Sequence, residues 1–216
     1  MTSCLVIAGA SAVGKTTVAH RLIESGKFEL VRSVTTREKR GDAFDAEYIY
    51  LTREEFIALI SSGGVLEHTE YSGNLYGTPR SEIERIARDG KTPLLILDLV
   101  GVRSLASAEG ISPCAVYLWE ELFVMEKRLY DRYIGDAPSV EGLKKYLSRK
   151  NQNISDYLEI EKFAPYFYAF IKGGTVEESA EAIGRTLRAF LDGKKSDSEK
   201  NLSTAREMRE FAEQIQ

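Results

Sequence analysis

The chain has few of the residues that mark a secreted, membrane or metal-binding protein. It has only two cysteines among 216 residues. Cys4 and Cys114 each lie in an apolar run, which favours reduced core thiols over a disulfide or a metal site. No apolar run approaches the ~20 residues that span a bilayer. The N-terminal residues carry no charged leader segment, so we expect no signal peptide, no membrane partner and a cytoplasmic protein.

An excess of charge of one sign is also lacking. The net charge is -4, so no strong field draws polyanions to the molecule and nucleic acid is not an expected partner. The hydrophobic fraction of 43% is enough for the core of one compact domain. Neither observation distinguishes a monomer from a homodimer.

Short apolar runs alternate with helical patterns along the chain. Strands are expected at Cys4–Ala8, Leu94–Leu97, Ala115–Trp119 and Tyr166–Ile171, and helices at Lys15–Ser25 and Val176–Leu191. This alternation predicts an α/β fold whose parallel sheet is covered by helices on both faces. The polar tail at 193–216 is expected either to be mobile or to pack on a neighbour, with a helix at Thr204–Gln214 as one alternative.

Local signals predict further boundaries. Thr52 followed by Glu55 predicts a capping box at the start of a helix. Thr78-Pro79 predicts a helix cap followed by proline at the first helical position. Residues 33–47 are polar and basic with no apolar period, which favours a functional loop.

Residues 9–16 read GASAVGKT and match the phosphate-binding pattern G-x-x-x-x-G-K-[ST]. Such a loop points backbone N–H groups at phosphates, and the following helix adds its positive end. Lys15 supplies a cation to the β- and γ-phosphates, and Thr16 supplies a hydroxyl to Mg²⁺, the expected cofactor of ATP. The predicted ATP-binding residues are Gly9, Ala10, Ser11, Ala12, Val13, Gly14, Lys15, Thr16 and Thr17.

Three further features suit a phosphotransferase. Asp98 ends the apolar run LLILD, where its carboxylate is a second candidate for Mg²⁺, through a water. Arg37 and Arg40 are three residues apart and suit bidentate contacts to one phosphate. Tyr48 and Tyr76 add neutral hydroxyl donors. Taken alone, the two arginines fit a solvated basic loop better than a phosphate site.

These features together resemble the guanylate kinase family over roughly residues 3–190. The family's S-x-T-T-R-x-x-R segment, its tyrosine and its E…GNxYGT segment recur here in the same order, with nearly the same spacings. The resemblance implies a P-loop NTPase-type fold at 1–192, with a core of 1–32, 91–124 and 160–192. It places a GMP-binding segment at 33–90 and a lid at 125–159.

The resemblance also implies transfer of the ATP γ-phosphate to GMP, with dGMP as a further acceptor. Glu67, assisted by Asp98, would accept hydrogen bonds from the guanine N1–H and 2-amino group. Adenine lacks that pair of donors and would leave the Glu67 carboxylate unpaired. The implied GMP-binding residues are Ser33, Arg37, Arg40, Tyr48, Glu67, Tyr76, Thr78 and Asp98. The implied catalytic residues are Lys15, Arg37, Arg128 and Arg132.

The chain departs from the family pattern on the ATP side. Ala12 stands where glycine is usual, and Tyr146 stands near the usual place of a third lid arginine, with Arg149 close by. Two alternatives remain: a catalytically silent guanylate kinase-like module that binds proteins, and a P-loop kinase for another phosphorylated acceptor. Lys15 argues against the first alternative, and Glu67 with the GNLYGT run argues against the second.

Overall fold

A computed structural model describes residues 1–39, 41, 43–71 and 73–215, with only the backbone described at 43, 44 and 71. Arg40, one of the expected GMP-binding residues, lies outside the described residues. The strands are β1 (Thr2–Ala8), β2 (Phe28–Leu30), β3 (Ser33–Thr35), β4 (Tyr48–Tyr50), β5 (Val65–Tyr71), β6 (Asn74–Pro79), β7 (Thr92–Ile96), β8 (Ile111–Trp119) and β9 (Ala169–Lys172). The α-helices are α1 (Lys15–Ile23), α2 (Arg53–Ser61), α3 (Arg80–Arg88), α4 (Leu99–Ala106), α5 (Leu122–Tyr133), α6 (Val140–Phe163), α7 (Val176–Leu191) and α8 (Ser198–Glu213). Short 3₁₀ turns cover Ala43–Glu47 and Ala164–Tyr166.

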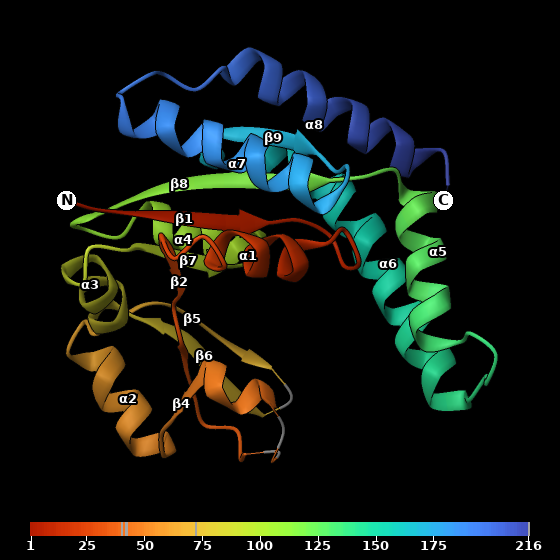
Figure 1. The fold of residues 1–216 in the computed structure, drawn as a ribbon. Coiled ribbons are helices and arrows are strands. Elements are labelled where there is room, and N and C mark those ends of the chain that lie inside the picture. Colours follow the sequence, from red (N-terminus) through yellow and green to blue (C-terminus); the bar gives the residue numbers. More distant parts are fainter. Residues whose placement is uncertain (40, 42, 72, 216) are drawn as a thin grey trace.

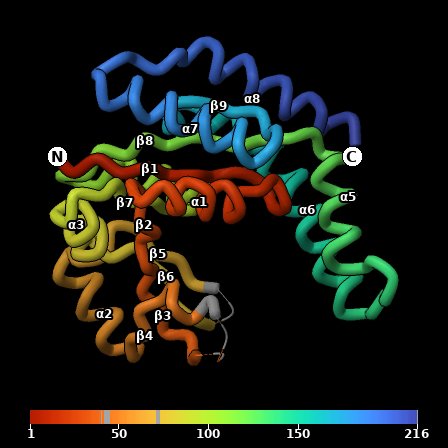
Figure 2. Tube along the Cα trace, viewed as in Figure 1, coloured from red at the N-terminus to blue at the C-terminus, as the bar shows by residue number. Residues whose placement is uncertain are grey.

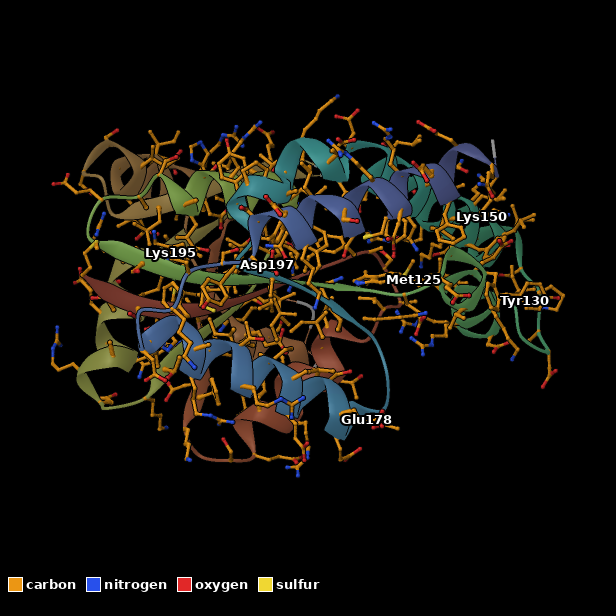
Figure 3. All side chains as sticks on the ribbon, turned by 90° about the horizontal axis from the view of Figure 1, so that it is seen from above. Met125, Tyr130, Lys150, Glu178, Lys195 and Asp197 are labelled. Carbon is orange, nitrogen blue, oxygen red and sulfur yellow. The ribbon has the colours of Figure 1, made fainter. Side chains whose placement is uncertain are left out.

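The main sheet is parallel, in the order β2-β7-β1-β8-β9. Its central strand β1 is fully buried from Cys4 to Ala8, as expected of a strand with helices on both faces. Helices α1 and α7 pack together, as do α4 and α6, and Figure 3 shows α7 and α8 on opposite sides of the strands. The predicted α/β fold with a covered parallel sheet is therefore confirmed.

A second, smaller sheet has the order β4-β3-β6-β5. Helix α2 covers it, and its Phe56 joins Val34 and Leu75 in a separate small core. The prediction of a loop throughout 33–47 is wrong, because Ser33–Thr35 forms β3 and Ala43–Glu47 forms a 3₁₀ turn. Three strand residues are too few to show a period of two, so the apolar pattern misses them.

The capping box at Thr52 is confirmed, because its hydroxyl accepts from the Glu55 N–H while Glu55 bonds back to the Thr52 N–H. The cap expected at Thr78 is wrong. Thr78 belongs to β6, and Pro79 occupies the cap position without a side-chain bond. Thr78 instead lies opposite Glu67 across the β5–β6 pair and donates its hydroxyl proton to the Glu67 carboxylate.

The chain end is a structured part of the molecule. Helix α8 begins at Ser198, six residues before the helix considered at Thr204, and it packs along α6. Its buried Asn201 accepts from the Phe170 N–H of edge strand β9 and donates to the Phe167 and Tyr168 carbonyls. The helix thereby covers strand-edge groups that would otherwise be open to pairing with another chain. The last strand starts at Ala169 rather than Tyr166, since Pro165 lies in a 3₁₀ turn.

An ion-pair cluster fixes the crossing from the main sheet to the small sheet. Arg32, between β2 and β3, donates two hydrogen bonds to Glu82 of α3, at 2.9 and 3.0 Å. Arg85 adds bonds to Glu82 and reaches Glu29 of β2 at 2.6 Å. The Arg32 bonds, assisted by those of Arg85, lower the pKa of Glu82 to about 2. Helix α3 also buries Ile83 and Ile86 in the main core, so the small sheet rests on a rigid base.

We predict that Glu82→Gln lowers the free energy of unfolding by roughly 2 kcal/mol at pH 7, because two arginines lose their common anion. A carboxylate with a lowered folded-state pKa stabilises the fold above its unfolded value, near 4.5, and loses that effect as pH falls toward 2. Urea unfolding at pH 7 and pH 2.5 measures the difference. The exposed Glu84→Gln on the same helix is the control. An equal deficit at both pH values contradicts the assignment.

Candidate functional site

The phosphate-binding loop follows β1 directly, and its first glycine is required by close packing. Gly9 has φ of 152°, and a Cβ there would overlap the backbone carbonyl oxygen of Leu118 in β8. Gly14, with φ of 107°, precedes the first residue of α1. The chain therefore leaves the buried centre of the sheet, turns tightly and enters a helix whose free N–H groups face the loop.

Ala12 is the only residue other than glycine with positive φ in the described part of the chain, at 65°. An L-residue in this region costs about 1 kcal/mol. Two side chains hold the backbone around it. Arg128 of α5 donates to the Ala12 carbonyl at 3.2 Å, and Asn153 of α6 bonds both backbone groups of Ser11. Asn153 was not predicted from the sequence, because a lone asparagine in a charged helix carries no local signal.

Lys15 curls back over the loop and donates to the Gly9 and Ala10 carbonyls at 2.7 and 2.9 Å. Burial lowers its pKa to about 8; the charge of Asp156 opposes this change, while Arg149 and Arg132 add to it. The ammonium group is therefore still mostly protonated at neutral pH, yet it sits among like charges that an anion would neutralise.

A cavity of about 250 Å³ lies over this loop. Its lining consists of Ser11, Ala12, Gly14, Lys15, Thr16, Thr17, Arg132, Tyr133 and Arg149. Arg149 thus supplies a cation at the loop. Tyr146, near the usual place of such a residue in the family, instead donates to Glu126 at 2.6 Å and packs edge-on against Tyr130. Among the residues described, Arg132 and Arg149 come to the loop from two different helices, α5 and α6.

The base-reading end of the expected acceptor site is built on β5 and β6. Thr78 donates to Glu67 at 2.6 Å, and burial raises the pKa of Glu67 despite that bond, with the Asp98 charge adding to the rise. Gly77 permits the strand pairing, since a Cβ there would crowd the Glu67 carbonyl and Val65. Asp98 caps α4 by accepting from the Gly101 N–H at 2.7 Å. Two carboxylates therefore lie close together at this end.

The other end of the acceptor segment carries cationic and phenolic groups. Arg37 lies over the Tyr48 ring, 5.2 Å from its centre, and bonds Tyr50 at 3.1 Å and Asp45 at 3.3 Å. Tyr76 meets Tyr48 edge to face. Tyr50 and Asp45 were not expected in the site. They hold the guanidinium in place from the adjoining strand and turn.

A second cavity, of about 220 Å³, lies between α1, the ends of β7 and the small sheet. Ser33, Tyr48 and Thr78 line it, and so does Thr16 of the phosphate-binding loop. Thr16 is therefore common to both cavities. Figures 1 and 2 show the small sheet and the α5–α6 hairpin projecting from the same side of the main sheet. The arrangement brings a loop for an oligophosphate beside a cavity whose walls carry hydroxyl groups among apolar side chains. This suits transfer of a phosphoryl group between two bound molecules.

The expected residues thus gather at two places. Of the expected loop residues, six line one cavity together with Arg132: Ser11, Ala12, Gly14, Lys15, Thr16 and Thr17. Gly9, Ala10 and Val13 do not line it, and Arg128 reaches the loop from outside the lining. Ser33, Tyr48 and Thr78 line the other, and Glu67 with Asp98 stands behind Thr78. Within the described residues, no group of three or more metal-ligating side chains is found, and no helix is long and apolar enough to cross a membrane.

Comparison with known proteins agrees with this geometry. A family model described as guanylate kinase matches residues 1–190. The guanylate kinase of Anaplasma phagocytophilum is 32% identical over 189 residues, covering 86% of this chain and 85% of that protein. Human guanylate kinase is 32% identical over 190 residues, covering 82% and 94%. A crystal structure of the Anaplasma guanylate kinase aligns with a TM-score of 0.60 at 24% identity, covering 94% of both chains, and bears on the fold alone.

Proposed function

This chain belongs to the guanylate kinase family, and from that premise we propose that it transfers the γ-phosphate of ATP to GMP, giving ADP and GDP. The proposal extends to dGMP as a second acceptor. The observation that carries it is the shared wall at Thr16, where the cavity of the phosphate-binding loop meets the cavity bounded by Thr78 and Ser33. Donor and acceptor phosphates bound in the two cavities would meet there.

Glu67 is the residue that selects the acceptor base. Guanine presents an N1–H and a 2-amino group side by side, and a carboxylate accepts from both. The Thr78 hydroxyl bond orients Glu67, while Asp98 stands close enough to raise the Glu67 pKa. Ser33 and Thr78 are the proposed donors to the guanine O6. Adenine in this place would leave the buried Glu67 carboxylate without its partners.

The acceptor phosphate is assigned to Arg37, Tyr48 and Tyr76, with Arg40 as their fourth partner. Arg37 is already oriented by Tyr50 and Asp45, so a phosphate finds the guanidinium in place rather than having to order it. The Asp45 carboxylate accepts from Arg37 in the absence of a phosphate. A bound phosphate and this carboxylate would therefore compete for the same guanidinium N–H groups.

The transferring group is stabilised by cations around the loop. Lys15, Arg132 and Arg149 converge on one cavity, and Arg128 approaches the loop at Ala12. The acceptor is itself a phosphate oxyanion, so the reaction requires positioning and charge neutralisation rather than a strong general base. Bound phosphates would offset the burial of the Lys15 ammonium group, which is the main cause of its lowered pKa, and also its repulsion by Arg149 and Arg132.

The residues beside the loop suit Mg²⁺, which prefers hydroxyl, carboxylate and water oxygens. Thr16 is an exposed residue at the start of α1 and carries a hydroxyl. The Oδ1 of Asp98 accepts a hydrogen bond from the Gly101 N–H, which leaves the second carboxylate oxygen for a metal-bound water. When bound, the ion would neutralise charge on the β- and γ-phosphates.

We assign residues 33–90 to acceptor binding and 125–159 to the lid, around a core of 1–32, 91–124 and 160–192. The separate small core of Val34, Phe56 and Leu75 supports the first segment as a body of its own. Closing these segments over the substrates would exclude water that otherwise accepts the phosphoryl group.

A catalytically silent module is disfavoured, since both Lys15 and Arg37 are in place.

We predict that Lys15→Ala lowers turnover at least about 100-fold, because the transferring phosphoryl group loses its nearest cation. A coupled assay of ADP release, run with GMP, dGMP, AMP, CMP, UMP and no acceptor, measures this and the acceptor class. Lys162→Ala, which removes a surface lysine paired with Glu159, is the matched control with an unchanged rate. Normal GMP-dependent ADP release by Lys15→Ala would sink the proposal.

Glu67→Gln is expected to lower kcat/KM for GMP about 100-fold, because one of the two guanine donors loses its acceptor. The KM for ATP should stay within about twofold. The same assay with varied GMP and then varied ATP separates the two effects. Glu70→Gln, on the same strand and exposed beside Arg53, provides the comparison. Equal losses for GMP and ATP would show that Glu67 acts on the fold rather than on the base.

The pH profile of kcat/KM for ATP is expected to fall as pH rises through about 8, where free Lys15 loses its proton. The profile of kcat should fall only at higher pH, because bound phosphates stabilise the protonated lysine. Lys15→Arg keeps its charge and should show neither fall at its lower activity. Flat profiles to pH 9.5 in the unsubstituted enzyme would contradict the assignment.

A further inference from the structure

We propose that Asn153 is a positioning residue for ATP binding: from the lid helix α6 it holds the phosphate-binding loop in the left-handed turn at Ala12 that this chain builds without glycine. The inference rests on the proposed function only in assigning the loop to the donor phosphates. It extends that function by identifying the residue, Asn153 of α6, that maintains the conformation of the phosphate-binding loop.

The contact is a two-bond clamp on one backbone unit. The Ser11 N–H donates to the Asn153 Oδ1 at 2.7 Å, and the Asn153 Nδ2 donates to the Ser11 carbonyl at 3.0 Å. An amide side chain can supply donor and acceptor together, as a neighbouring strand would. Asn153 is 2% exposed, so water does not compete for either bond. The clamp fixes the peptide groups on both sides of the Ser11 Cα.

Ala12 is the residue immediately after the clamp, and it has φ of 65°. Glycine adopts this region freely, whereas a residue with a Cβ stays there only when its surroundings hold it. The clamp fixes the chain before Ala12, and Arg128 holds the Ala12 carbonyl after it. Without the clamp, the strained turn can relax, and the loop N–H groups then lose their common direction toward phosphates.

The position of Asn153 on α6 gives the clamp a second effect. Arg149 precedes it by four residues and Asp156 follows by three, so the three side chains share one face of the helix. Arg149 lines the loop cavity, and the charges of Arg149 and Asp156 both act on Lys15. Anchoring Ser11 to Asn153 therefore sets the place of these groups relative to the loop.

A double-substitution experiment tests the role. Asn153→Ala is expected to raise the KM for ATP and the Kd for Mg·ADP about tenfold, with the KM for GMP changed less than about twofold. In the Ala12→Gly background, the same Asn153→Ala step should raise both constants less than about threefold, because glycine needs no clamp to keep the turn. Calorimetry for Mg·ADP and the coupled ADP assay provide the constants.

Two further variants keep the result interpretable. Asn153→Leu retains the buried volume while removing both bonds, and it should reproduce the Asn153→Ala effects in a chain that unfolds cooperatively on heating. Asn201→Ala removes an equally buried amide that bonds the backbone around β9. It should lower the melting temperature without changing the KM for ATP, which separates general stability from loop position.

The possible outcomes distinguish a failure of the Asn153 positioning role from a failure of the proposed function. An unchanged KM for ATP in both Asn153 variants, or an equal loss with and without Ala12→Gly, overturns the positioning role while the unsubstituted enzyme still phosphorylates GMP. Absence of GMP-dependent ADP release from the unsubstituted enzyme overturns the proposed function instead. In that case, Mg·ADP binding alone still shows whether Asn153 holds the loop.

Discussion

The site depends on the parallel pairing of β1 with both of its neighbours. The register sets Ala8 beside Tyr117 of β8 and Ile7 beside Ile96 of β7. The next residue, Gly9, then passes so close to the Leu118 carbonyl that no side chain fits. Because the strands are parallel, their carboxyl ends reach one edge of the sheet. The phosphate-binding loop and Asp98 meet there as a consequence of register alone.

Positive and negative side chains gather at different parts of the site. The loop end gathers Lys15, Arg132 and Arg149, whereas the far end of the acceptor segment places Glu67 near Asp98. Burial is the main cause of the lowered Lys15 pKa and of the raised Glu67 pKa, and the neighbouring like charges add to each shift. Under the proposed assignment, the guanine donors meet Glu67 and the GMP phosphate meets Arg37, while the loop cations face the phosphates of ATP. On this assignment, a nucleotide that leaves these buried charged groups without partners would bind less tightly than GMP.

The parts that sequence could predict are those in which contiguous residues determine the geometry. The phosphate-binding loop and the Thr52 cap each encode their local structure in neighbouring residues. Asn153, Arg149 and Tyr50 escaped prediction because each acts through a contact with a distant segment, and its own neighbourhood looks like an ordinary helix or strand. Thr78 was misjudged as a cap because cross-strand pairing with Glu67 took its hydroxyl. Helix α8 started earlier than its apolar pattern because Asp197 caps it and buried Asn201 replaces an apolar residue in its first turns.

Helix α6 begins in the segment that we assign to the lid and continues into the core, which limits how the proposed lid could close. Asn153 is bonded to the loop, and the Tyr157 hydroxyl is bonded to both backbone groups of Glu120. A rotation of the whole 125–159 segment would break all of these bonds, so we expect the pivot of a closure to lie on the N-terminal side of Asn153. Arg149 is then one turn from the pivot and moves little, whereas the tip around Val140 moves most. If the lid closes in this way, the cations at the loop are already in position, and closure would chiefly shield the phosphates from water rather than deliver charge to them.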